Sequence, residues 1–274
     1  MMKKRLTLLL AAAVLAAVPA LSQSRFNRGD LDRLVGRIAL YPDPLLAQVL
    51  TASTYSNDVP AAEAWAHQHS RLSGDALARS IDNDRLPWDP SVLALLPFPS
   101  VLEMMARDPG WTEDLGNAVL SQRAEVMDAV QRMRHKAMEY GYLRPGPQYR
   151  IQGREIVEII PTGTDFFVPV YDPLIVYAPP RPGFFVGGAI TFGPRIFLGA
   201  AFAPWGWRNP GFGWREHAIM IDNHVWERTV VNRTTYVHNY AAPAPRRVEG
   251  ARVERHEVQE HREHERAERG HWRR

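Results

Sequence analysis

The pattern of apolar residues changes at one point in the chain, and this change limits the possible folds. Up to about residue 142, apolar residues recur at the helical period, as in Leu31, Leu34 and Ile38. The prolines and glycine of residues 144–147 end this pattern, and β-branched and aromatic residues dominate after them. The sequence therefore predicts an α+β chain, with a bundle of short helices over residues 30–143 and a β-rich region over residues 148–240.

Asp-Pro pairs divide the first half into short helices. They begin at Asp43, Asp89 and Asp108, each before an apolar run. An aspartate at a helix start accepts hydrogen bonds from free amides, and proline is tolerated in the first turn. We therefore interpret the three aspartates as caps and not as a carboxylate cluster for acid/base catalysis. The longest helix is expected over residues 112–140, and no heptad repeat indicates a coiled coil.

Several strands are expected after the helices. Residues 149–160 alternate around Gly153 and predict a hairpin. Residues 165–170 and 174–177 predict two further strands, with a turn at Asp172 between them.

The following segment, residues 179–213, is rich in glycine and aromatic residues. Gly193-Pro194-Arg195 interrupts it, which favours a hairpin or a loosely ordered aromatic surface over a membrane span. Residues 217–226 and 229–240 then alternate like strands.

The first 22 residues have the layout of a Sec-type signal peptide. Three basic residues at positions 3–5 precede an uncharged apolar stretch, and small residues follow near Ala20 and Ser22. A retained membrane anchor is the alternative, but Pro19 breaks the stretch, which is shorter than the ~20 residues of a spanning helix. The chain has no cysteine, which excludes a lipoprotein and disulfides. We expect cleavage and a periplasmic or secreted protein with no transmembrane span.

Removal of the signal peptide changes the charge of the chain. The formal net charge is +3, and the signal peptide carries three basic and no acidic residues, so 3 − 3 = 0 remains. Without a concentrated basic face, the sequence gives no reason to expect a nucleic-acid partner. Residues 241–274 are rich in Arg, Glu and His, and this composition predicts a disordered tail.

Two sets of side chains are candidate binding residues. His261 and His264 could share a helix face in the tail and bind Zn²⁺ or Ni²⁺ weakly, the alternative being a solvated tail without metal. Four tryptophans could form a surface that stacks on a glycan, a partner or a membrane interface. The alternative is that they fill the core of a small sheet. These tryptophans are Trp205, Trp207, Trp214 and Trp226.

Other candidate sites are weaker. His67 and His69 are two residues apart, so on a helix they point to different sides. Nothing in the spacing of His217, His224 and His238 requires them to converge. We find no nucleophile elbow, no phosphate-binding glycine loop and no cofactor motif, so we predict no catalytic residue and no cofactor.

The chain resembles a known family in five places. These are residues 34–55 (LVGRIALYPDPLLAQVLTASTY), 74–77 (GDAL), 88–92 (WDPSV), 126–134 (VMDAVQRMR) and 168–173 (VPVYDP). In content and order they resemble the exported bacterial family labelled domain of unknown function 3300, over about residues 30–214. The resemblance implies an envelope or secreted protein of Gram-negative bacteria. It implies no activity and no catalytic residues.

The sequence leaves three functions open. The first is a non-catalytic protein of the cell envelope that binds another macromolecule, either a protein or a glycan. The second is an envelope hydrolase acting on peptidoglycan or polysaccharide. The third is peripheral attachment to the outer membrane through the glycine- and aromatic-rich segment.

Overall fold

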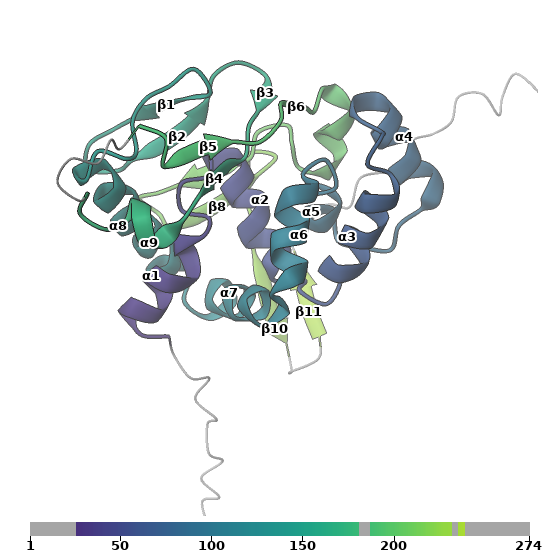
Figure 1. The fold of residues 1–274 in the computed structure, drawn as a ribbon. Helices are drawn as coiled ribbons and strands as arrows, with labels where there is room; N and C mark the ends of the chain where they lie inside the picture. Colours follow the sequence, from purple (N-terminus) through teal and green to yellow (C-terminus); the bar gives the residue numbers. More distant parts are fainter. Residues whose placement is uncertain (1–25, 181–186, 232–234, 239–274) are drawn as a thin grey trace, which may run out of the picture.

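The α+β class predicted from the sequence is confirmed by the computed structural model, which describes residues 26–180, 187–231 and 235–238 (Figure 1). The predicted signal peptide and the predicted tail, with His261 and His264, lie outside these residues. Helices make up the first half, and short antiparallel strands follow.

The first half is a bundle of short helices, as expected. The helices are α1 (Arg28–Gly36), α2 (Asp43–Ser53), α3 (Val59–Gln68), α4 (Gly74–Asp84), α5 (Pro90–Leu93), α6 (Pro99–Arg107), α7 (Pro109–Ser121) and α8 (Arg123–Glu139). Helix α2 lies at the centre, in contact with α5, α7 and strands of the second half. Every residue of α2 except Pro44 is buried, because most of its side chains are apolar or small and the two larger polar ones, Asp43 and Gln48, are hydrogen-bonded.

The predicted helix over residues 112–140 is in fact two helices, so this prediction was wrong. The chain leaves the helical conformation at Gln122, with φ −143° and ψ 42°, between α7 and α8. The Gln122 side chain instead holds the backbone of Phe26 by two hydrogen bonds, of 2.8 Å to its nitrogen and 3.1 Å to its oxygen. This contact is distant in sequence, so helical periodicity alone does not indicate the break.

Among its described residues, the second half contains short strands, one further α-helix and one 3₁₀ helix. The elements are β1 (Tyr149–Gln152), β2 (Glu158–Pro161), β3 (Asp165–Phe166), β4 (Pro169–Tyr171), α9 (Pro173–Val176), β5 (Ile190–Phe192), β6 (Ile196–Phe197), η1 (Ala200–Trp205), β7 (Gly211–Gly213), β8 (Ala218–Ile221), β9 (His224–Val225), β10 (Arg228–Val231) and β11 (Thr235–His238). Strands β1 and β2 form the hairpin that the sequence predicts. Its turn requires Gly153, because φ is +82° and a Cβ would lie 1.9 Å from the Ile156 oxygen.

Two expectations for the second half were wrong. Residues 174–177 do not form a strand but belong to or follow α9, whose first amides are capped by Asp172 through a 2.8 Å bond to the Leu174 nitrogen. The chain around Gly193-Pro194-Arg195 does not turn into a hairpin of its own. Strands β5 and β6 instead pair with β4 and β3, and the Gly193 nitrogen donates to the Val168 oxygen between the two pairings.

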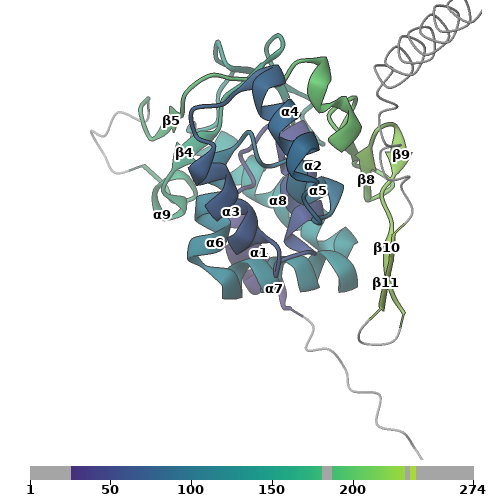
Figure 2. The same ribbon diagram turned by 90° about the vertical axis from the view of Figure 1, so that its right-hand side faces the viewer.

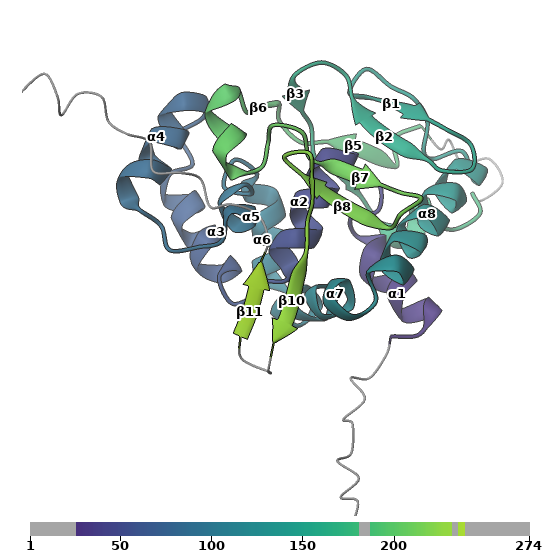
Figure 3. The same ribbon diagram turned by 180° about the vertical axis from the view of Figure 1, so that it is seen from behind.

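The two halves share one hydrophobic core, which runs from Leu31 in α1 to Trp226 after β9. The hairpins of β8–β9 and β10–β11 lie along one side of the helices (Figure 2). Seen from behind, β7 and β8 cover α2, and β10 lies beside α7 (Figure 3). The β-rich half therefore packs directly on the bundle.

Candidate functional site

A buried charged centre joins the two halves of the chain. Arg134 in α8 is fully buried, and its guanidinium lies 2.7 Å from the Asp43 carboxylate. The same guanidinium donates to the carbonyl oxygens of Ala39, Tyr41 and Val157, at 2.7–3.0 Å. A buried cation is tolerated only when it is paired and hydrogen-bonded in this way. These contacts hold α8 against the start of α2 and against the segment that precedes β2.

Asp43 is not a helix cap, which corrects the interpretation from sequence. It is the first residue of α2, and its side chain makes no capping hydrogen bond. Its carboxylate turns inward and accepts hydrogen bonds from the Ile159 nitrogen at 3.2 Å and from Trp214 Nε1 at 2.9 Å. The negative charge still lies at the favourable end of the helix dipole. The pairing with Arg134 explains why this aspartate is buried.

The other two aspartates are caps, as predicted. Asp89 accepts from the Ser91 nitrogen at 2.9 Å, at the start of α5. Asp108 accepts from the Trp111 nitrogen at 3.1 Å, at the start of α7. This hydrogen bond and the guanidinium of Arg37 hold the pKa of Asp108 below its usual value.

Two tyrosines extend the buried centre. The Tyr171 hydroxyl accepts from the Leu40 nitrogen at 3.2 Å, and the Tyr177 hydroxyl donates to the Gly36 oxygen at 3.0 Å. Burial raises the pKa of both phenols, so both stay protonated. These bonds tie the segment around α9 to the end of α1.

The four predicted tryptophans do not form an exposed stacking surface. Trp205, Trp214 and Trp226 are buried in the shared core, so for these three the structure favours the core interpretation. Trp207 is half-buried and stacks on Phe98 with ring centroids 5.1 Å apart. Its Nε1 donates to the Ala94 oxygen at 2.9 Å. The rings of Trp214 and Trp226 lie over the guanidinium groups of Arg134 and Arg123 in α8, at 5.0 and 5.2 Å from the ring centroids.

The histidines within the described residues have separate surroundings. His69 stacks on Trp65, His217 lies 2.9 Å from Asp128, and His224 contacts the backbone of Asp222. Across residues 26–180, 187–231 and 235–238, no three His, Asp or Glu side chains are grouped so that they could hold a metal ion.

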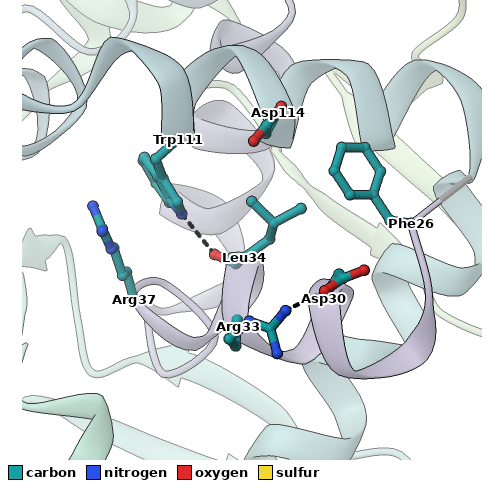
Figure 4. Close-up of a pocket in the computed structure, with 7 residues that line it drawn as sticks. All are labelled: Phe26, Asp30, Arg33, Leu34, Arg37, Trp111 and Asp114. Atoms are coloured by element: carbon teal, nitrogen blue, oxygen red, sulfur yellow. Dashed lines mark hydrogen bonds and ion pairs between the residues drawn. The ribbon is translucent and has the colours of Figure 1, made fainter. Parts of the chain in front are cut away.

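A pocket between α1 and α7 combines charged and aromatic side chains (Figure 4). Its volume is about 430 Å³. Trp111 and Asp114 face it from α7, and Asp30 and Arg33 face it from α1. Arg33 pairs with Asp30, one helical turn away. The pocket therefore presents both signs of charge beside an apolar wall.

The walls of this pocket are fixed by contacts that are distant in sequence. Trp111 Nε1 donates to the Leu34 oxygen at 3.0 Å, which holds α7 against α1. The Arg37 guanidinium lies 5.1 Å from the Trp111 ring and 2.9 Å from Asp108. Phe26 is held at the open end by Gln122, the residue that separates α7 from α8.

This pocket was not predicted from the sequence. One signal was present, because Arg33 and Arg37 are four residues apart and so lie on one helical face. Their juxtaposition with Trp111 and Asp114 depends on the packing of two helices far apart in the chain. Such a pairing cannot be read from periodicity.

Comparisons with known proteins identify a family but no activity. Residues 27–273 match the model of a family described as protein of unknown function, DUF3300. A 133-residue stretch is 40% identical to the uncharacterized protein YacH of Escherichia coli (strain K12). The match covers 48% of this chain and only 21% of that relative's length. No solved structure matches the chain.

In the described part of the chain, none of the helices has the length and apolar character needed to cross a membrane. The family match extends over most of the chain, including the five stretches from which the resemblance was noted. The chain belongs to the DUF3300 family.

Proposed function

We propose that this member of the family is an exported protein of the cell envelope that binds a peptide segment of a partner protein without catalysing a reaction. Export is supported by the basic, apolar and small-residue layout of residues 1–22. Binding is supported by one observation, the charged and aromatic pocket between α1 and α7. Its volume of about 430 Å³ is typical of ligand-binding pockets.

The chemistry of the pocket fits a peptide that carries both signs of charge. Arg33 and Arg37 can bind carboxylates, Asp30 and Asp114 can bind ammonium or guanidinium groups, and Trp111 offers an apolar wall. Three of these four charges are already paired within the protein, Arg33 with Asp30 and Arg37 with Asp108. A ligand must exchange these partners, so we expect modest, salt-dependent binding.

The test uses the protein recovered from the periplasm as bait in cross-linking to envelope proteins. Its intact mass should begin after Ala20 or Ser22, and a product that retains Met1 would contradict export. We expect a discrete partner to be cross-linked to the wild-type protein. Arg33→Glu should abolish this product, because the new carboxylate beside Asp30 repels the acidic groups that Arg33 would bind.

Arg107→Glu is a matched control. Arg107 is as exposed as Arg33, at 75% against 77% of the side chain, and it too pairs with an acidic residue on its own helix, Glu103. It does not line the pocket. The control should keep the cross-linked partner. Equal capture by the Arg33→Glu variant and the wild-type protein would disprove a role for this pocket.

A further inference from the structure

A second pocket lies where α7 meets the C-terminal end of α2, on a different face of α7 from the pocket in Figure 4. Its volume is about 220 Å³. Its wall is mostly polar and includes Ser53, Thr54, Asp58, Glu113, Asn117 and Arg228. Three separate parts of the chain, α2 with the loop after it, α7 and the start of β10, thus contribute to one cavity.

The wall of this pocket includes two buried hydroxyl groups. The buried hydroxyls of Ser53 and Thr54 donate to the carbonyl oxygens of Leu50 and Thr51, at 2.8 and 2.7 Å. Each donated hydrogen is thereby used, and the hydroxyl oxygens keep acceptor capacity. Gly116 of α7 closes the base, so close to α2 that a Cβ there would lie 2.2 Å from the Ser53 oxygen.

The wall of the pocket carries charged groups of both signs. The guanidinium of Arg228 lies 3.6 Å from the ring centroid of Tyr55 and donates to Thr54 Oγ1 at 2.7 Å. Glu113 and Asp58 provide carboxyl groups elsewhere in the wall. Burial, together with the negative charge of Asp89, raises the pKa of Asp58, and the nearby Arg228 opposes this shift.

This mixture of groups disfavours a ligand that carries a net charge of either sign. A free anion would be repelled by the carboxylate of Glu113, and a free cation would be repelled by Arg228. A ligand with many hydroxyl groups matches the wall better, because each hydroxyl donates and accepts at once. Asn117, whose amide also does both, lies exposed at the mouth beside Glu113.

We propose that this pocket binds one sugar residue of a glycan chain. Its volume of about 220 Å³ is below the ~300–1,000 Å³ of pockets for drug-sized ligands, so it admits one ring. The exposed positions of Glu113 and Asn117 leave room for the rest of the chain to continue outside. The site is independent of peptide binding between α1 and α7.

Calorimetry of the exported, full-chain protein tests this site. The two probes are a tetrasaccharide of β-1,4-linked N-acetylglucosamine and one of β-1,4-linked glucose, which distinguish peptidoglycan-like from other polysaccharides. We expect one of them to bind. The double change Glu113→Ala and Asn117→Ala should weaken this binding at least tenfold with no change in melting temperature, since both side chains are exposed.

Asp114→Ala is the control, because Asp114 is exposed on the same helix but faces the pocket of Figure 4. It should bind the tetrasaccharide as the wild-type protein does. The proposal is overturned if neither tetrasaccharide binds at millimolar concentration, or if the double variant binds as tightly as the wild-type protein. Either result would leave the proposed peptide binding untouched, because that rests on Arg33 and its neighbours.

Discussion

Arg134 places a full charge in the core, so its replacement should lower the free energy of unfolding by an amount that can be estimated. Arg134→Met keeps much of the volume but leaves the Asp43 carboxylate buried without an opposite charge. Removal of one partner of a buried ion pair typically costs about 3–5 kcal/mol. We expect a loss of this size in the free energy of unfolding, measured by urea denaturation.

Two further variants test this explanation. Adding Asp43→Asn to Arg134→Met should cost less than the sum of the single changes, because neither charge is then left uncompensated. Arg132→Met is the control on the same helix, since Arg132 pairs with Asp32 at 2.6 Å and is partly exposed. It should cost about 0–1 kcal/mol. Additive losses in the double variant would show that the ion pair is not the cause.

The role of Asp43 could not be predicted from the sequence, because it depends on a partner that is distant in the chain. Asp43, Asp89 and Asp108 have the same local signal, an aspartate before a proline at a helix start. Two of them cap helices, and Asp43 instead binds a cation that is 91 residues away, from position 43 to position 134. Local spacing specifies a cap, but it holds no information on which helix packs alongside.

At the scale of helices, α7 approaches the end of α2 closely at Gly116. A Cβ on Gly116 would lie 2.2 Å from the Ser53 oxygen, which belongs to the backbone and cannot move aside. Gly116→Ala should therefore push the helices apart and destabilise the protein by at least the ~1–3 kcal/mol typical of overpacking. The melting temperature measures this loss.

Gly110→Ala is a matched control on the same helix. The nearest atom to a Cβ at Gly110 is 4.0 Å away, which is ordinary contact. This change should be neutral or stabilise the protein by up to about 1 kcal/mol, because alanine favours the helix. If both variants melted alike, the close packing of α7 on α2 would be an incorrect description.

Elements determined by neighbouring residues in the sequence could be predicted. Elements determined by contacts between residues far apart in the sequence could not. The fold class, the bundle of short helices and the hairpin around Gly153 follow from periodicity, proline and glycine. The break at Gln122 depends on its bonds to Phe26, and the pairing of β3 with β6 joins segments about thirty residues apart. Both pockets lie between such distant segments, which is why no single motif indicated them.

At the scale of the whole molecule, we expect a sharp boundary between the folded body and the C-terminal segment that begins near residue 241. The core extends to Trp226, and Arg228 then donates to the oxygen atoms of Thr54 at the end of α2. From residue 241 the composition is too poor in apolar residues to build a core. We therefore predict that removal of residues 243–274 leaves the melting temperature unchanged.

Removal of residues 228–274 should have a different effect, because it also takes away the guanidinium bound to Thr54. Hydrogen bonds to a charged group contribute about 1.5–3 kcal/mol, which corresponds to roughly 3–12 °C in a domain of this size. Any binding of Zn²⁺ or Ni²⁺ measured by calorimetry should already be lost with the shorter truncation, which removes His261 and His264. A large fall in melting temperature on removal of residues 243–274 would instead show that this segment packs on the body of the protein.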